Sequence, residues 1–482
     1  MKHKIQKIMS VFILMTGLTP AQYLALKTVP VATGNQFLIF PSQNSGMGFV
    51  SIAVDDPLAD PFRNPAKKGE NETSFIYGTP VVANPSTDDG QTNTIPLGYR
   101  YIGENWYGTF STAIQHIKDF GVSDNSRNNS FTNTSSGAHN NVFVYGSFGK
   151  SYLSDGFVGI SALWADLGGM QGVSLLYPRS SKVDQSGYLR EIRIGTVKNL
   201  KNGDTIETVF LRHEVSMTHN VNYNGGRWWG QPITRVEINK DRTITNGFHY
   251  KLKKPLQNNY TMGFLFNYNR KEHPKIPNYD IMNIPRDPGE TDIVNIGFGL
   301  AEIHEEATIG IDFIYEPAWS HTWAEADQNI NRGSDPPIYQ GEKTIDNQFR
   351  FDNYLVNFGA RNKTNNNSEL LFGLSFYNVS YTLKQIDFIT NTIRYQDESW
   401  TEKMITWGII KHYKKFNLYY NGNISLGTGL PSTQWIDDRI TTFGMETAFA
   451  GFTDFMVAPG GDLMLDEIYL ITHQLTITIP IR

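Results

Sequence analysis

Few residues in this chain have the types and spacing that catalysis or metal binding requires. His304-Glu305-Glu306 offers an imidazole beside two carboxylates, but a helical zinc site needs a second histidine four residues later, and position 308 is Thr. We interpret this triplet as a solvated hairpin turn. His321, Glu325 and Asp327 fall in a stretch predicted to be a loop, and their spacing matches no known cation-binding loop.

Other catalytic arrangements are equally sparse. Arg212, His213 and Glu214 are consecutive on a predicted strand, so Arg212 and Glu214 share a face and are predicted to join a charge ladder in the interior. No Gly-x-Ser-x-Gly elbow occurs. The chain has no cysteine, so thiolate metal sites and disulfides are excluded. The sequence therefore predicts a protein that is not an enzyme, with no catalytic residue, no metal and no cofactor.

Four tryptophans could bind an apolar ligand. Trp228 and Trp229 follow a glycine-rich stretch, and Trp319 and Trp323 fall in a second stretch predicted to be a loop. One interpretation is that these tryptophans line a hydrophobic groove. The alternatives are that they anchor the protein at a membrane interface or pack within a loop.

The start of the chain predicts export. A basic start at Lys2, His3, Lys4 and Lys7 precedes a largely apolar run over residues 8–18, and Thr19-Pro20-Ala21 offers a small-residue cleavage site. The apolar run is too short to span a bilayer as a helix, so residues 1–21 are predicted to be a cleaved signal peptide.

Composition narrows the class of exported protein. Aromatic residues make up 13% of the chain and charged residues only 18%, a balance that favours strands and turns. The net charge of −5 is small for 482 residues and argues against a nucleic-acid partner.

Alternation of apolar and polar residues recurs along the chain. In the segment 260–270 one face is apolar and the other is polar, with Leu265 as the exception. The segment from 307 repeats the pattern, with Ile314 as its exception, and the last strand alternates up to Ile481. One face that suits hydrocarbon and one that suits water indicate an all-β, transmembrane antiparallel β-barrel. A soluble β-sandwich or propeller is the alternative.

The connections fit the same fold. Asn202-Gly203, Asn258-Asn259 and Lys414-Lys415 mark short turns, and long polar stretches predicted to be loops alternate with them at 123–141, 220–242, 271–290 and 317–343. Short turns at one end and long loops at the other are typical of bacterial outer-membrane barrels. The alternating segments number roughly fourteen to sixteen.

The region after the predicted signal peptide carries a family resemblance. Its most distinctive residues, in order, are Gly46, Met47, Gly48, Asp55, Asp56, Asn64, Pro65 and Ala66. This motif resembles the N-terminal region of the FadL superfamily, outer-membrane transporters for long-chain fatty acids and other hydrophobic compounds. The related PorV-type proteins of the type IX secretion system share the same opening. From the residues alone, a surface turn at Asn64-Pro65 and solvated loop acids at Asp55 and Asp56 are the competing interpretation.

The resemblance implies a specific architecture. It implies about fourteen strands and an N-terminal hatch folded inside the lumen, so we expect a hatch over residues 22–90 and a barrel over residues 91–482. It also implies release of an apolar ligand through a lateral opening in the wall. The expected location is the bacterial outer membrane, with membrane lipid as a partner and no nucleic acid.

Two functions stay open at this point. The first is passive uptake of small, long-chain-fatty-acid-like hydrophobic compounds through a plugged barrel. The second is a PorV-like scaffold that binds secreted cargo and other secretion-system proteins. A structural barrel with neither activity is the third possibility. A gap in the wall would favour uptake, and a broad platform at the loop end would favour cargo binding.

Overall fold

A computed structural model of the 482-residue chain describes most of it. The described residues are 30, 32, 37–68, 73–86, 90–118, 137–152, 155–171, 173, 181–228, 231–273, 289–326, 329–431 and 465–481. The predicted signal peptide at residues 1–21 lies outside these ranges, so its cleavage stays a prediction. In the described part of the chain, no helix has the length and apolar character needed to cross a membrane.

Strands make up almost all of the regular structure. Two short helical turns come first, η1 (Ser45–Met47) and α2 (Asp60–Arg63). The strands in chain order are β1 (Phe75–Gly78), β2 (Val81–Pro85), β3 (Gln91–Ile102), β4 (Trp106–Lys118), β5 (Ala138–Tyr152), β6 (Gly156–Leu167), β7 (Lys182–Asn199), β8 (Thr205–Trp228), β9 (Gln231–Pro255), β10 (Tyr260–His273), β11 (Gly289–Ile303), β12 (Ala307–Glu325), β13 (Ile330–Arg332), β14 (Asp335–Ile338), β15 (Lys343–Asn365), β16 (Ser368–Asp387), β17 (Thr392–His412), β18 (Asn417–Pro431) and β19 (Leu465–Pro480).

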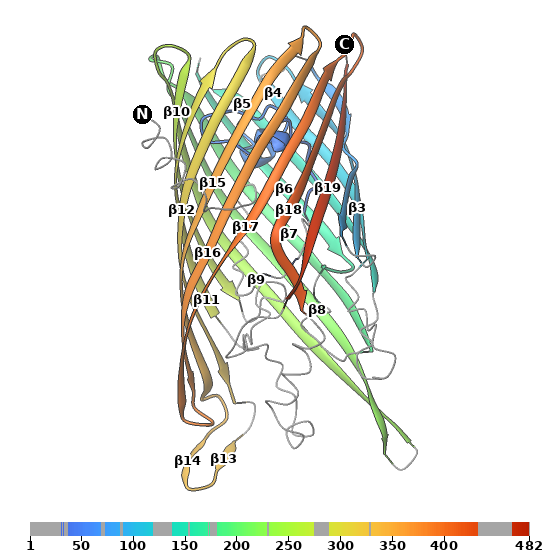
Figure 1. Ribbon diagram of the computed structural model, residues 1–482, viewed down its shortest axis with the longest axis vertical. Helices are drawn as coiled ribbons and strands as arrows, with labels where there is room; N and C mark the ends of the chain where they lie inside the picture. The colour runs from blue at the N-terminus through green and yellow to red at the C-terminus, as the bar shows by residue number, and fades with distance from the viewer. Residues whose placement is uncertain are drawn as a thin grey trace, which may run out of the picture.

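These strands close into an antiparallel barrel (Figure 1). Each strand from β3 to β12 pairs with the next, β12 pairs with β15 past the small β13–β14 hairpin, and the order continues to β19. β1 and β2 both lie between β19 and β3, so they form one interrupted position of the wall. The main sheet has 17 strands among the described residues, and the closed ring therefore has 16 positions.

The expected number of fourteen strands is wrong. Fourteen is the number that the family resemblance implies, whereas the alternating segments themselves allow as many as sixteen. The wall also begins earlier than residue 91, because β1 starts at Phe75, within the range expected for the hatch.

The two faces of the wall differ in chemistry. Large apolar side chains form an exposed outward band, with Ile95, Phe110 and Phe298 each more than half exposed. The inward positions are rich in buried Asn, Thr and Ser. Met262 of the segment 260–270 lies in the outward band, and Leu265, its exception, is buried inside. A closed sheet with an outward apolar band meets the requirements of a transmembrane barrel.

The two ends of the barrel also differ. At one end, which we call the short-turn end, strands join through tight turns such as Asn258-Asn259, where both residues have positive φ. At the other end, the long-loop end, the strands run further than expected. The stretches 220–228, 231–242 and 317–325, predicted to be loops, are parts of β8, β9 and β12. Backbone pairing continues there although the apolar alternation has ended, and Figure 1 shows β8 and β9 projecting at this end.

Candidate functional site

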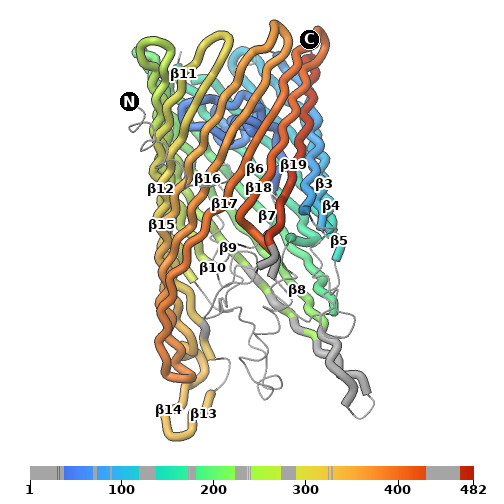
Figure 2. The backbone as a smooth tube through the Cα atoms, in the orientation of Figure 1, coloured from blue at the N-terminus to red at the C-terminus, as the bar shows by residue number. Residues whose placement is uncertain are grey.

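Residues 37–68 lie inside the ring of strands, and we call them the inner segment. Figure 2 shows this dark-blue stretch enclosed by the wall, near the short-turn end. Its residues bond to side chains from opposite parts of the ring, including Tyr107 on β4, Arg193 on β7, Asp312 on β12 and Asn421 on β18. The segment therefore crosses the interior of the barrel and is bonded to strands on opposite sides.

Asp56 fixes the internal fold of the inner segment. Its buried carboxylate accepts hydrogen bonds from the Ser42 hydroxyl (2.6 Å) and from the backbone N–H groups of Gln43, Asn44, Leu58 and Ala59 (3.0–3.1 Å). These donors would otherwise be buried without a partner in irregular backbone. One carboxylate thus ties the start of the segment to the turn that enters α2.

Asn64 ends α2 and connects it to the wall. Its Oδ1 accepts a hydrogen bond from the Ala66 N–H (3.0 Å), which closes a local turn through Pro65. Its Nδ2 donates to the Thr196 carbonyl (3.2 Å) and to Glu207 (3.3 Å). The turn at Asn64-Pro65 is therefore a buried contact between the inner segment and strands β7 and β8, and not a surface turn.

Glycines of the wall make room for the inner segment. Gly359 and Gly373 are cross-strand neighbours, and a Cβ on either would collide with the backbone at Met47 and Gly48. Gly159 and Gly195 form a second cross-strand pair, where a Cβ would collide with Pro65 and Asn64. Gly263 and Gly299 form a third pair beside Ile52. Because only glycine allows such close backbone approach, these pairs mark where the segment rests on the wall.

Residues 46–52 are held mainly by uncharged donors and by shape, and we call these contacts the neutral dock. A charged donor also takes part, since Lys251 Nζ of β9 donates to the Ser51 carbonyl (2.8 Å). The Gly46 N–H donates to Asn421 Oδ1 (3.1 Å), and the Gly48 N–H donates to Thr406 Oγ1 (2.8 Å). The N–H groups of Ser51 and Ile52 donate to Asp312 Oδ2 (2.7 and 3.1 Å). Gly48 itself has a φ of 68°, which favours glycine.

An apolar cluster completes the neutral dock. The Ile52 side chain packs with Leu265, Ile314 and Leu355 from three strands of the wall. Leu265 and Ile314 are the two exceptions to the apolar–polar alternation of their strands. Each places an apolar side chain on the inward face because Ile52 covers it there.

Residues 55–67 are held mainly by charge, and we call these contacts the charged dock. Lys67 Nζ lies 2.7 Å from Asp60, 3.1 Å from Asp55 and 2.8 Å from Glu207 of β8. Lys251 and Lys253 of β9 also approach Asp55, with Lys251 Nζ at 3.8 Å. Three cations and three carboxylates thus join the inner segment to β8 and β9.

The charges of the inner segment compensate one another. Burial opposes ionisation of Asp55 and Asp60, but neighbouring cations, Lys67 foremost, outweigh it and lower the pKa of both carboxyls below their usual range. Burial likewise opposes the charge of Lys67, but Asp55, Asp60 and Glu207 raise its pKa well above the usual value. All three groups of the segment are therefore charged at neutral pH.

Wall cations also cap the backbone near α2. Arg193 Nη1 donates to the carbonyls of Phe62 (3.0 Å) and Arg63 (3.2 Å), where α2 ends, and Arg193 is itself ion-paired with Glu191. Arg100 donates to the Lys68 carbonyl (2.6 Å), and the Tyr107 hydroxyl donates to the Ala66 carbonyl (2.6 Å). A helix C-terminus leaves carbonyls unpaired, so these donors stabilise it in place.

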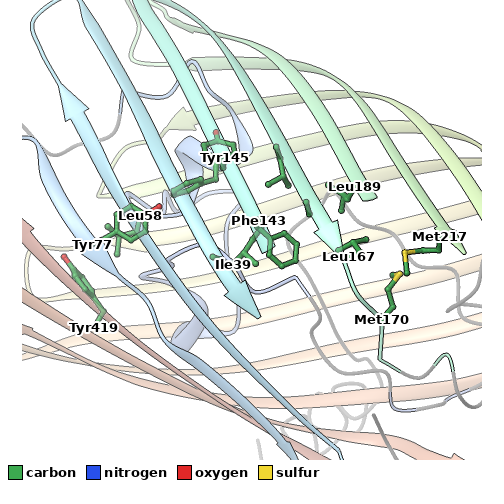
Figure 3. Packing of buried hydrophobic residues seen from close by; sticks show 14 of the residues in the cluster. Ile39, Leu58, Tyr77, Phe143, Tyr145, Leu167, Met170, Leu189, Met217 and Tyr419 are labelled. Atoms are coloured by element: carbon green, nitrogen blue, oxygen red, sulfur yellow. The ribbon is translucent and has the colours of Figure 1, made fainter. Parts of the chain in front are cut away.

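An apolar cluster connects the segment to strands β5–β8. Phe40 stacks on Phe62 with ring centroids 4.2 Å apart, and Tyr145 of β5 lies against both rings. Figure 3 shows the same cluster extending from Ile39 and Leu58 along the inward faces of these strands, through residues that include Phe143, Leu167, Leu189 and Met217. Apolar side chains of β5–β8 thus line part of the interior beyond the inner segment, among buried polar groups such as Gln185 and His219.

The wall has a seam between β17 and β18. Their register ends at Lys403 and Leu426, although β17 continues to pair with β16 as far as Thr392. Beyond the seam, Gly429 of β18 bonds instead to Pro30 and Ala32, through two backbone hydrogen bonds of 2.9 Å. Among the described residues, the stretch 392–402 of β17 therefore has a strand partner on one side only.

The residues singled out in the sequence fall into two groups. The first group is the motif, which lies in the inner segment. The neutral dock contains Gly46, Met47 and Gly48, and the charged dock contains Asp55. The fold of the segment between and beside these docks depends on Asp56, Asn64, Pro65 and Ala66.

The second group is the four tryptophans. Trp319 lies on the outward face of β12, 46% exposed, and Trp323 follows on the same face, with its indole N–H donating to Glu325 (2.9 Å). Trp228 ends β8 but its side chain lies outside the description, as does all of Trp229.

Several chemical candidates have ordinary structural roles. His304 lies in the β11–β12 turn and contacts Glu302 (2.7 Å), as expected for a solvated turn. His321 lies on β12 rather than in a loop, 3.1 Å from Asp346 of β15, and Asp327 lies outside the described residues. No group of three or more His, Asp or Glu side chains in the described ranges could hold a metal ion.

The predicted interior charge ladder on β8 is wrong. Arg212 and Glu214 share a face, but it is the outward face that also carries the exposed Phe210, while His213 is buried inside. Wall charges that do contact the inner segment, among them Glu207, Lys251 and Arg193, were missed in the sequence. The available signal was a charged residue within a short β-branched stretch, as at Glu207 in residues 205–209.

Comparison with known proteins yields structural similarity only. No family model and no curated protein matches the chain. Among solved structures, it is similar to a Pseudomonas aeruginosa FadL homologue, with 9% identity, a TM-score of 0.45, and 92% of this chain and 99% of that chain covered. It is also similar to the CymD monoaromatic hydrocarbon channel, with 10% identity, a TM-score of 0.44, and 93% and 99% covered.

Two further structures complete the comparison. The Pseudomonas putida toluene transporter TodX has 11% identity and a TM-score of 0.40, with 94% of this chain and 100% of that chain covered. The siderophore receptor PirA from Acinetobacter baumannii has 8% identity and a TM-score of 0.37, with 76% of this chain covered, and the chain spans 63% of PirA. FadL-type transporters are thus among the solved structures that the chain resembles. All these TM-scores are below 0.5.

Proposed function

We propose that this protein is an outer-membrane channel for small hydrophobic compounds, in which the inner segment acts as the hatch. The observation that carries the proposal is the inner segment itself, which spans the ring and is bonded to strands on opposite sides. An enclosed segment held by many separate contacts blocks free diffusion, so a ligand passes only when part of the segment moves. The protein works by binding and gating, without a chemical step.

The apolar cluster along β5–β8 and the seam between β17 and β18 give this channel a path. We assign the long-loop end to the cell exterior, because bacterial outer-membrane barrels have periplasmic short turns and external loops. A ligand entering there meets the apolar cluster on the inward side of β5–β8 before it reaches the inner segment. The seam between β17 and β18 begins at the outward pair Lys403 and Leu426, next to the apolar Ile405, so it offers release toward the membrane. Fatty acids and other apolar small molecules are the expected ligand class.

A cargo scaffold of the PorV type is the second candidate. The observation that favours it is the projection of β8 and β9 past the apolar band, where Val236 and Ile238 are both more than 60% exposed. Exposed β-branched residues on a projecting hairpin provide a surface for a secreted protein or a secretion component.

Native mass spectrometry with lipid extraction separates the two functions. The protein is purified in detergent from its own outer membrane, and the bound molecules are identified. A co-purifying fatty acid or other apolar small molecule supports the channel. A ligand-free barrel bound to a secreted protein or to secretion components supports the scaffold and contradicts the channel.

A further inference from the structure

Three arginines form a basic patch on the outer surface of the barrel. Arg190 on β7, Arg212 on β8 and Arg242 on β9 all lie on outward positions of three adjacent strands. In the register of the sheet, Arg190 lies opposite Glu214 and Arg242 lies opposite Ser216. The three side chains therefore start within four residues along β8, a span of about 13 Å.

The patch lies directly at the edge of the apolar band. Its nearest neighbours toward the short-turn end are Ile192 and Phe210, which are 53% and 59% exposed, and Phe248, whose ring lies 5.1 Å from that of Phe210. Along these strands the apolar side chains that face hydrocarbon are thus followed by guanidinium groups, at the level where lipid headgroups begin. This patch lies on the long-loop side of the band.

The carboxylates nearby do not neutralise the patch. Glu214 is the acidic residue within it, and its Oε1 accepts hydrogen bonds from Arg242 (2.9 Å) and from the Tyr188 hydroxyl (2.9 Å). Asp166 of β6 lies at the margin, opposite Tyr188. Within the described part of the chain, neither Arg190 nor Arg212 has an ion-pair partner: Arg190 lies over the Tyr188 ring (4.3 Å) and Arg212 donates to Asn246 (2.9 Å).

We infer that the basic patch binds the phosphate group of an anionic lipid in the membrane leaflet on the long-loop side. Guanidinium groups bind phosphate oxygens through paired hydrogen bonds, and a tyrosine ring beneath an exposed arginine, as at Tyr188 and Arg190, is typical of a membrane interface. The adjacent Ile192 and Phe210 contact the acyl chains of the same lipid, which free phosphate lacks. The patch therefore selects a lipid by its headgroup charge at one position on the ring.

Lipid titration followed by native mass spectrometry tests this site. Delipidated, detergent-purified protein is titrated with phosphatidic acid and, separately, with phosphatidylcholine of the same acyl chains. The patch variant carries Arg190→Gln, Arg212→Gln and Arg242→Gln together. The matched control variant also loses three cations, through Arg270→Gln, Lys343→Gln and Arg350→Gln, each of which already has a carboxylate partner.

The expected result is a loss confined to the patch variant. Its affinity for phosphatidic acid falls about tenfold or more, because each Arg near an anionic surface contributes roughly a fivefold factor. The control variant binds phosphatidic acid as the native protein does, and phosphatidylcholine binding is unchanged in all three proteins. Equal losses in the two variants, or no loss in the patch variant, overturn the inference.

Two further measurements keep the test decisive. Inorganic phosphate is added as a competitor, and full displacement of phosphatidic acid at equal concentrations would show an anion site without lipid selectivity, which also overturns the inference. Folding is checked by the gel migration of unheated samples. If the triple variant does not fold, Arg190→Gln with Arg212→Gln replaces it, since neither of these residues has an ion-pair partner among the described residues.

Discussion

The neutral dock and the charged dock hold the same inner segment in different ways. The neutral dock uses mainly backbone N–H groups, wall glycines and apolar packing, with the Lys251 ammonium as a charged donor at Ser51, so it depends mostly on close fit. The charged dock uses six ionised groups, of which Lys67 contacts carboxylates from both the segment and the wall. The first is sensitive to volume, and the second is sensitive to the loss of a single charge.

This difference indicates which part of the segment can move on its own. Buried ion pairs lose most of their stabilisation when one partner is removed, whereas a close-fitting backbone contact needs displacement of the wall or of the segment. Removal of one charged side chain is therefore expected to detach residues 55–67 from the wall together. The chain lacks cysteine, so a single introduced thiol reports on either dock. Ala59→Cys reports on the charged dock and Ala53→Cys on the neutral dock, since both alanines are buried.

The largest effect is expected from Lys67→Met. The substitution leaves Asp55, Asp60 and Glu207 without their shared cation, and we expect the docked state to lose about 3–5 kcal/mol. The labelling rate of Ala59→Cys by a polar thiol reagent should rise far more than that of Ala53→Cys. Lys68→Met is the control, because among the described residues its Nζ donates only to the exposed Glu104 carbonyl. Equal labelling in the Lys67 and Lys68 variants would show that the charged dock does not hold the segment.

Gly359→Ala should weaken the neutral dock. A Cβ at this position collides with the Met47 carbonyl, so the expected cost is about 1–3 kcal/mol. Here labelling of Ala53→Cys should increase and that of Ala59→Cys should change little. Gly146→Ala is the control, since a Cβ at Gly146 meets nothing within 4 Å. Faster labelling at both reporters would mean that the docks are not independent.

Acid should separate the two docks. The pKa values of Asp55 and Asp60 are lowered in the folded protein, so their stabilisation is present above the unfolded pKa, about 4, and is lost as pH falls further. The raised pKa of Lys67 means that its contribution is lost only at strongly alkaline pH. Hydrogen exchange measured by mass spectrometry should lose protection over residues 55–67 before residues 46–52 as pH falls below about 4. Simultaneous loss in both stretches would contradict the separation.

The smallest effect is expected from Asp312→Asn. The amide oxygen still accepts a hydrogen bond from Ser51 or Ile52, so only the charge-assisted part is lost, about 1.5 kcal/mol. A small increase in Ala53→Cys labelling should result, with Ala59→Cys unchanged. Asp352→Asn, on the outward face of β15, serves as the control. An effect as large as that of Lys67→Met would show that the neutral dock also depends on charge.

The sequence predicted the barrel better than it predicted the docks. Apolar–polar alternation identifies which face meets hydrocarbon, because that property belongs to each strand separately. The exceptions at Leu265 and Ile314 were informative, since both lie under Ile52, but their common partner is distant in the chain. The motif residues from Gly46 to Ala66 do lie in the inner segment, whereas Arg193, Glu207 and Lys251 acquire their role only through tertiary pairing. Strand ends were misplaced at 220–242 because backbone pairing outlasts the apolar pattern.

The most direct test of the proposal that the inner segment acts as a hatch is a reversible tether between this segment and the wall. Ser45 Oγ lies 3.3 Å from Gln474 Oε1 of β19, so Ser45→Cys with Gln474→Cys can be bridged by a short, cleavable bifunctional thiol reagent. Uptake of a fluorescent apolar compound is then measured in cells before bridging, after bridging and after cleavage, with each single-cysteine variant as a control. The account predicts that bridging stops uptake and that cleavage restores it. Uptake that continues unchanged through the tethered state would contradict the role of the inner segment as the hatch.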